Sequence, residues 1–127
     1  MFRSILLVAA FLILEARIYS QSLSYAPNSC LIESVRVYED VNRKFNNRNI
    51  WNNVLIFKFD IKSSSNKYVT VGHAVSIFNW QGKYFVYDIN QGSIILNTEA
   101  DLKNDPFKAA RLLYPNHRIK YAKYMSQ

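Results

Sequence analysis

The sequence predicts an α+β domain in which an N-terminal helix packs on a mainly antiparallel β-sheet, with a short helix late in the chain. Three observations lead to this class: a stripe of apolar residues at helical spacing, several runs of β-branched and aromatic residues between turn signals, and a second helical pattern near the C-terminus. Half of the 127 residues are apolar, so the chain has enough apolar surface to form a core.

The first twenty residues are predicted to be an export signal. A basic start at Arg3 is followed by the apolar run Ser4–Leu14 and then by polar residues, which is typical of a secretory signal peptide. The run is too short for a transmembrane span, which needs about 20 apolar residues. Cleavage is expected near Ala16 or Ser20, leaving a secreted or periplasmic single domain over residues 21–127. An uncleaved amphipathic anchor is the alternative.

Residues 28–45 are predicted to form an amphipathic helix. Apolar side chains recur there at spacings of three and four, which places them on one face. Asn28 or Ser29 is expected to cap the helix start, because their side chains accept hydrogen bonds from the first free backbone N–H groups. Cys30 then falls in the first turn. The apolar stripe consists of Leu31, Val35, Tyr38, Val41 and Phe45.

Runs of β-branched and aromatic residues after this helix predict five strands. Ser63–Asn66 is expected to form a turn. Asn79–Gly82 is expected to form a tight hairpin with Trp80 and Gln81 in the loop, since Gly82 can supply a positive φ. The strands are expected at residues 54–61, 68–78, 83–89, 93–96 and 118–124.

A late helical segment is predicted between the fourth and fifth strands. Thr98–Asp101 resembles a helix start, and Asp105–Pro106 is a second start, with Pro in the first helical position where its missing N–H does no harm. Apolar residues then share one face until Tyr114–Pro115 ends the helix.

The formal net charge of +7 favours anionic surroundings. An anionic cell-envelope polymer is one partner that this charge allows. The basic residues are dispersed and form no compact patch interleaved with stacking aromatics, so nucleic acid is not expected as a partner. The chain has no zinc-ligand spacing, no phosphate-cradling glycine run and no serine nucleophile elbow. Neither a metal nor another cofactor is therefore predicted.

The single cysteine, Cys30, restricts the chemistry of an exported protein. It cannot form an internal disulfide, so it is unpaired, cross-linked to another chain or chemically employed. The attacking form of a thiol is the thiolate, which the free N–H groups and dipole of a helix N-terminus stabilise. Cys30 is therefore a candidate nucleophile, and a small core residue is the alternative.

His73 is the better of two candidate bases. His117 follows Tyr114–Pro115 in a loop without an evident acidic partner. His73 interrupts an apolar strand face, so its ring needs a polar partner. A two-residue loop at Trp80 and Gln81 would place His73 opposite Asp88, and a three-residue loop with a bulge at Gly82 would move Asp88 one place along.

A thiol, an imidazole and a carboxylate have compatible roles in nucleophilic catalysis. The carboxylate holds one tautomer of the ring and stabilises its charged form, while the ring takes the proton of the thiol. Cys30, His73 and Asp88 are thus predicted to form a triad of nucleophile, base and orienting residue. Two alternatives remain open: His73 as a structural residue, and Asp88 as the first residue of a turn.

Three short motifs carry a family resemblance. Asn28–Leu31 opens the helix, Gly72–Val75 begins a later strand, and Tyr84–Gly92 covers the neighbouring strand and its turn. Their order resembles that of the papain-like and transglutaminase-like thiol enzymes, and the spacing from His73 to Asp88 is similar to that in transglutaminase cores and bacteriocin-processing peptidase domains. The resemblance covers roughly residues 28–124. It implies a papain-like fold with cysteine peptidase or amidase chemistry on a peptide or protein substrate.

Two positions depart from the papain pattern. Papain-type enzymes carry a Gln six residues before the Cys to bind the oxyanion, and here Ser24 stands at that position. Gln21 and Asn28 are displaced substitutes for it. Leu31 replaces the aromatic residue that commonly follows the nucleophile. The small domain also lacks the long lobes of a deep cleft, which argues against broad proteolysis.

The sequence thus supports two hypotheses. The first is an exported thiol hydrolase or acyltransferase that acts on amide bonds. The second is a catalytically inactive module of the same fold that binds anionic cell-envelope polymers or a protein partner.

Overall fold

The computed structural model describes residues 28–46 and 49–126. The predicted signal peptide, its cleavage sites and Gln21 lie outside the described residues. Two helices and five strands follow each other along the chain. They are α2 (Ser29–Lys44), β1 (Asn52–Lys62), β2 (Tyr68–Trp80), β3 (Lys83–Asp88), β4 (Gly92–Leu96), α3 (Pro106–Leu113) and β5 (Arg118–Tyr124).

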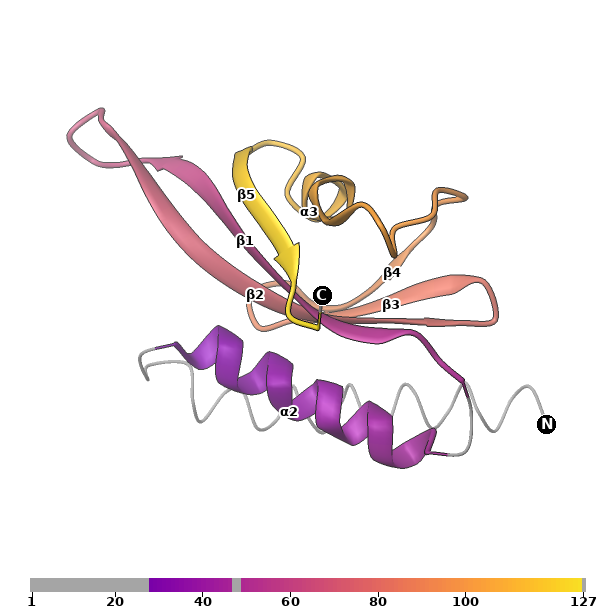
Figure 1. The fold of residues 1–127 in the computed structure, drawn as a ribbon. Coiled ribbons are helices and arrows are strands. Elements are labelled where there is room, and N and C mark those ends of the chain that lie inside the picture. Colours follow the sequence, from indigo (N-terminus) through magenta and orange to yellow (C-terminus); the bar gives the residue numbers. More distant parts are fainter. Residues whose placement is uncertain (1–27, 47–48, 127) are drawn as a thin grey trace.

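The five strands form one antiparallel sheet in the order β4-β3-β2-β1-β5. The helices α2 and α3 cover opposite faces of this sheet (Figure 1). The α+β class, the antiparallel sheet, the helix that carries the cysteine and the short late helix are therefore confirmed.

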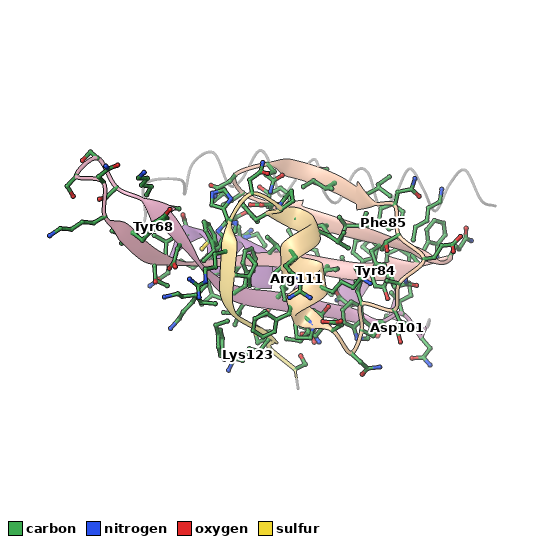
Figure 2. The ribbon with its side chains drawn as sticks, turned by 90° about the horizontal axis from the view of Figure 1, so that it is seen from above. Tyr68, Tyr84, Phe85, Asp101, Arg111 and Lys123 are labelled. Atoms are coloured by element: carbon green, nitrogen blue, oxygen red, sulfur yellow. The ribbon has the colours of Figure 1, made fainter. Side chains whose placement is uncertain are left out.

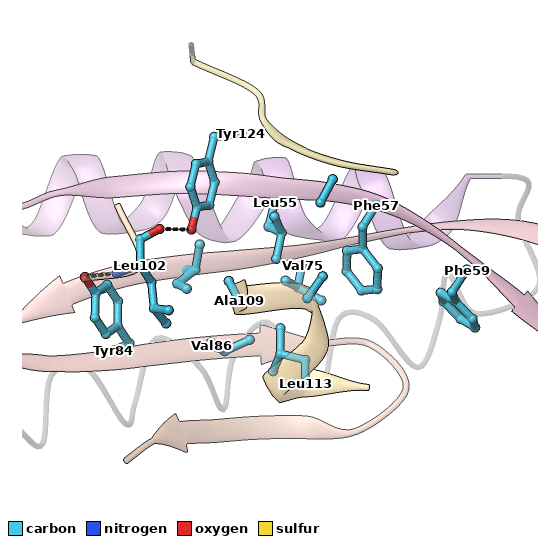
Figure 3. Packing of buried hydrophobic residues seen from close by; sticks show 13 residues of the cluster. Leu55, Phe57, Phe59, Val75, Tyr84, Val86, Leu102, Ala109, Leu113 and Tyr124 are labelled. Carbon is cyan, nitrogen blue, oxygen red and sulfur yellow. Dashed lines mark hydrogen bonds between the residues drawn. The ribbon is translucent and has the colours of Figure 1, made fainter. Parts of the chain in front are cut away.

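The α3 side of the sheet holds the larger core cluster (Figure 3). Alternate residues of the strands point to this side, and α3 covers them with Ala109, Ala110 and Leu113, all buried. Each fully buried Leu, Ile, Val or Phe contributes roughly 1.5–3 kcal/mol. The strand residues of this cluster include Leu55, Phe57, Val75, Ile77 and Val86.

The α2 side holds a second apolar cluster. Val37, Val41 and Phe45 of the helix lie in one cluster with aromatic residues of β2 and β3. Asn52 fastens the helix to β1, because its side-chain amide donates to the carbonyl of Tyr38 at 2.9 Å. The sheet residues of this cluster are Phe78, Trp80, Phe85 and Tyr87.

The β2–β3 hairpin corrects the predicted register. Trp80 belongs to β2 and pairs with Lys83, so the loop consists of Gln81 and Gly82, with φ values of 52° and 77°. Two positive φ angles are typical of the type I′ hairpin turn. Trp80 stays in the strand because its ring is buried on the α2 side, 6.4 Å from the ring of Phe45.

The predicted helix start at Thr98–Asp101 is wrong, since helix α3 begins only at Pro106. Side chains bond to the backbone two residues onward and form turns instead: Ala100 N–H donates to Thr98 Oγ1, and Lys103 N–H donates to Asp101 Oδ1. The second predicted start is confirmed, because the Asp105 side chain accepts from the N–H of Lys108.

Strand β2 runs past the end of β3, and this offset positions the candidate site. β3 pairs with β2 only between Ser76 and Trp80. Among the described residues, the first part of β2, residues 68–75, pairs with β1 alone. The β1–β2 hairpin projects beyond the N-terminal end of α2 (Figure 1).

Candidate active site

Cys30 lies in the first turn of α2, as the sequence predicts, and its side chain is partly exposed. The helix start differs from the expected cap. Asn28 takes a left-handed conformation with φ of 59°, and its side chain makes no capping hydrogen bond. Its carbonyl accepts instead from the N–H groups of Leu31 and Ile32, at 3.1 Å each. The backbone N–H of Cys30 has no intrahelical acceptor at this position.

His73 links the thiol to a carboxylate. It sits on β2, is only 7% exposed and faces the α3 side, where its ring packs edge-on against Phe57 and Tyr114. Its Nε2 lies 2.7 Å from Oδ1 of Asp88. The imidazole also hydrogen-bonds to the thiol of Cys30, and Nδ1 is the ring nitrogen left for that bond. The structure therefore brings the three predicted residues together in one chain of contacts.

The thiol reaches the imidazole around the open edge of β2. Asn79 donates its N–H to the carbonyl of Trp51, the residue just before β1, so the odd-numbered residues of β2 turn their backbone groups toward β1. The even-numbered residues then turn theirs outward. The N–H of Ala74, just beyond the last β3 pairing, accordingly donates to the sulfur of Cys30. Cys30 thus occupies the place that a longer β3 would have filled.

Asp88 is not directly opposite His73, as the predicted register had it. Ser76 pairs with Tyr87, and continuing this register would place Asp88 beside Val75. The carboxylate therefore reaches the ring along the diagonal between neighbouring strands, on the shared α3 side. The predicted contact is correct although its register is wrong.

Four donors hold the Asp88 carboxylate, which is fully buried. Oδ1 accepts from His73 and from the N–H of Asn90 at 2.9 Å. Oδ2 accepts from the hydroxyl of Tyr114 at 2.6 Å and from Gln91 Nε2 at 3.2 Å. The two hypotheses for Asp88, first residue of a turn and partner of His73, are thus compatible, because the same carboxylate makes the hydrogen bonds of both.

Sequence reasoning missed Tyr114 and Gln91. Gln91 also donates to the carbonyl of Leu113 at 3.1 Å, so it ties the turn after β3 to the end of α3. Tyr114 reaches Asp88 from the C-cap of α3. Neither spacing nor composition relates these positions to Asp88, since only the docking of α3 on the sheet brings them together.

The electrostatics favour a thiolate paired with an imidazolium. The hydrogen bond from His73 lowers the pKa of Cys30 against the opposing effect of burial, and the N–H of Ala74 adds to the lowering. Burial opposes the charged form of His73, but Asp88 and Cys30 outweigh it and raise the pKa of His73 to about 9. Burial likewise opposes ionisation of Asp88, yet its bond to His73 keeps the pKa of that carboxyl low.

The other predicted residues make no hydrogen bond to Cys30, His73 or Asp88 in the described part of the chain. His117 is exposed, and its ring packs against Phe59 and Tyr114 at centroid distances of 4.9 and 5.7 Å. Asn28 is exposed at the helix start. Within residues 28–46 and 49–126, no cluster of His, Cys, Asp and Glu is suited to hold a metal ion. In the same part of the chain, no helix is long and apolar enough to cross a membrane.

A comparison with known protein families, with characterised proteins and with solved structures found no match. The site is therefore interpreted from its own geometry.

Proposed function

We propose that this protein is an exported, papain-like thiol hydrolase or acyltransferase that acts on amide bonds through Cys30, His73 and Asp88. One observation carries the proposal: the sulfur, the imidazole and the carboxylate are joined by consecutive hydrogen bonds, at a helix N-terminus with partial access to solvent. The resemblance of the three motifs to papain-like and transglutaminase-like enzymes supports the same chemistry.

In the first half-reaction the Cys30 sulfur attacks the carbonyl carbon of the substrate amide. The C–S bond forms, and the carbonyl oxygen takes the displaced electron pair as an oxyanion. The His73 imidazolium then gives its proton to the amide nitrogen, the C–N bond breaks, and the amine leaves. A thioester on Cys30 and a neutral imidazole remain.

In the second half-reaction water or an amine attacks the thioester. Neutral His73 takes a proton from the incoming nucleophile, the C–S bond breaks, and the thiolate is restored beside the imidazolium. Water gives hydrolysis, and an amine gives acyl transfer. Asp88 remains ionised and holds the ring through Nε2.

The backbone N–H of Cys30 is the best donor to the oxyanion, because it lies at the helix N-terminus without an intrahelical acceptor. The Asn28 side chain is a second candidate donor, since it is exposed beside the first turn and makes no capping bond. Gln21, the other substitute, lies outside the described residues.

The second candidate function is an inactive binding module of the same fold. The net charge of +7 favours it, with an anionic cell-envelope polymer or a protein as its partner. The protein would then keep the three site residues as a buried polar cluster.

Alkylation by iodoacetamide at pH 6 distinguishes the two candidates, and every label reports on Cys30 because it is the only cysteine. An ordinary thiol is almost fully protonated at this pH. We expect rapid labelling of the native protein and a rate about 10- to 100-fold lower in His73→Ala, because one to two pKa units change the thiolate fraction by that factor. His117→Ala is the matched control and should keep the native rate.

Slow labelling that does not depend on His73 would favour the binding module. If labelling is fast, a screen of peptide amides and glutamine side chains with Cys30→Ala as the blank identifies the substrate. Hydroxylamine traps the thioester in either case, and the ratio of amide to acid formed when a primary amine competes with water separates acyl transfer from hydrolysis.

A further inference from the structure

The part of the β1–β2 hairpin next to the thiol is not covered by α2 or by any other described element (Figure 1). Even-numbered residues of β1 and β2 face the α2 side, but α2 begins only at Ser29, and the hairpin projects past it (Figure 1). Tyr68 lies on this projecting part, far from Tyr84 at the other end of the sheet (Figure 2). We define the arm face as Asp60, Tyr68, Thr70, Gly72, Arg118 and Lys120.

The arm face contains a cavity of about 540 Å³. It is lined by Asp60, Tyr68, Arg118 and Lys120, together with Asn116 from the turn before β5. Tyr68 is 72% exposed, so a large aromatic ring stands at the cavity without packing in the core. An exposed ring beside hydrogen-bonding groups is typical of surfaces that bind a partner.

The charge of this cavity is positive. Arg118 and Lys120 face a single acid, Asp60, which is already held by the hydroxyl of Thr70 at 2.6 Å and by Lys120 at 3.5 Å. Lys58 and Lys62 lie on the same side of β1, exposed, and add to the positive charge. A carboxylate fits these groups better than a cation does.

The surface between the cavity and Cys30 is open within the described part of the chain. A side chain added at Gly72 would meet none of the described atoms within 4 Å. Thr70 and Gly72 belong to the even-numbered set of β2 that shares the α2-side face with the cavity residues Asp60 and Tyr68. An extended peptide, the substrate of the proposed amide chemistry, can run from the thiol across this face to the cavity.

The spacing fits a short peptide. Ala74, whose N–H touches the sulfur, is followed back along β2 by Gly72 and Thr70, and Thr70 bonds to Asp60 at the cavity. Four residues of strand span roughly 13 Å at about 3.3 Å per residue, and Asp60 on β1 lies one strand spacing, about 4.8 Å, to the side of Thr70. A substrate chain in contact with Cys30 therefore reaches the cavity with a residue about four positions from its reacting carbonyl.

We propose that the arm face binds an acidic segment of the substrate, an extended peptide that carries Asp or Glu about four residues from the bond attacked by Cys30. This inference rests on the proposed function, whose substrate class it narrows. The peptide lies across the α2-side face of the hairpin, over Gly72 and Thr70, and Arg118 with Lys120 binds the carboxylate.

Peptide probes with a thiol-reactive end group test the proposal. One probe carries Glu four residues from the reactive carbon, and its partner carries Gln there. We expect the Glu probe to label native protein about tenfold faster, the ratio given by one charge-assisted bond. The preference should disappear in Arg118→Ala and persist in Arg111→Ala, an exposed Arg on α3 that serves as the control.

A second variant tests whether the peptide passes over Gly72, and it does so without changing the charge of the arm face. Gly72→Val suits a strand and meets open space in the folded protein, so circular dichroism should show a native fold. Its side chain would obstruct the peptide, and both probes should label it about tenfold more slowly. Labelling by the small reagent iodoacetamide should be unchanged.

Labelling by iodoacetamide also separates the enzyme proposal from the acidic-substrate inference, because this small reagent reacts with Cys30 without binding to the arm face. Rapid, His73-dependent labelling without a preference for the Glu probe overturns the acidic-substrate inference and leaves the thiol enzyme intact. If labelling is slow and independent of His73, the enzyme proposal fails. Fluorescence anisotropy of the Glu peptide with Cys30→Ala then tests whether the arm face binds an acidic peptide, and the absence of binding overturns that inference. Inorganic polyphosphate that binds through Arg118 while the Glu peptide does not would overturn the inference in favour of a polymer site.

Discussion

Two clusters of buried polar groups lie on the α3 side of the sheet, and they differ in charge. At one end, Tyr84 accepts a hydrogen bond from the N–H of Leu102, and Tyr124 donates one to its carbonyl (Figure 3). At the other end, Tyr114 donates to Asp88, which also binds His73. Both clusters satisfy buried polar groups through a tyrosine hydroxyl, but only the second contains an acid and a base in contact.

The comparison separates a structural role from a chemical one. The Leu102 cluster ends at an acid without a base: the backbone groups of Leu102 are paired, and Tyr84 also donates to Asp101 Oδ1 at 3.4 Å. Burial raises the pKa of Tyr84 and of Tyr124 away from the neutral range. In the Asp88 cluster the carboxylate binds His73, and His73 binds the partly exposed sulfur of Cys30. Satisfied hydrogen bonds alone therefore do not indicate a site, and the Asp88 cluster is the candidate site because its hydrogen bonds lead to an accessible thiol.

Of the substitutions that test the difference between the two clusters, Asp88→Asn should have the largest effect on the reactivity of Cys30. The substitution keeps the size of the side chain and removes its charge, so the pKa of His73 should fall and that of Cys30 should rise. Iodoacetamide labelling at pH 6 should slow by about 10- to 100-fold, and the histidine titration followed by NMR should move to lower pH. An unchanged rate with a native fold would show that Asp88 serves the turn alone.

Tyr114→Phe and Tyr124→Phe form a matched pair for the two clusters. Tyr124→Phe leaves the buried Leu102 carbonyl without its donor, so the free energy of unfolding should drop by about 1–3 kcal/mol, with no change in the pKa of His73. Tyr114→Phe removes a donor to Asp88, which makes the carboxylate more basic. The pKa of His73 should then rise further.

Denaturant unfolding measures the stability of both tyrosine variants, and NMR titration measures the pKa of His73 in each. A shift of the His73 titration in Tyr124→Phe, or none in Tyr114→Phe, would remove the distinction between the clusters.

Glu33→Gln should have the smallest effect and concerns a buried polar group outside both clusters. Glu33 is fully buried on α2, and neither carboxylate oxygen has a hydrogen-bond partner among the described residues, although Arg36 lies 3.7 Å away. Burial raises the pKa of Glu33 despite that cation. A raised pKa means that the native protein loses stability as pH rises through it.

The variant should therefore be more stable than the native protein at pH 7, by about 1 kcal/mol, because it buries no charge. The advantage should vanish at pH 4 and below, where Glu33 is protonated in both folded and unfolded chains. Urea unfolding at the two pH values measures it. A destabilised variant at pH 7 would mean that the ion pair with Arg36 outweighs the burial of charge.

Local patterns in the sequence were sufficient to predict most of the fold. Apolar periodicity predicts α2, alternation predicts the strands, and Asp105–Pro106 predicts the start of α3 to the residue. The contact of Cys30 with His73 and of His73 with Asp88 was also predictable, because a helix tip and a hairpin are local features that leave few partners for a lone polar residue on an apolar strand.

Features that depend on packing between distant segments were not predictable. The hairpin loop was misplaced because the burial of Trp80 against Phe45, rather than a turn propensity, decides where β2 ends. The turns at Thr98 and Asp101 could not be told from a helix start, because both use the same side-chain acceptors. Tyr114 joined the site only through the docking of α3.

The placement of α2 and α3 on opposite faces has a consequence for how the chain matures. The sulfur arrives with one layer, while Tyr114 and Leu113 brace the carboxylate cluster from the other. The proposed chemistry predicts an ordinary thiol pKa in a partly folded chain in which either helix is still undocked. Rapid labelling by iodoacetamide should then begin only late in refolding, when both helices have packed on the sheet.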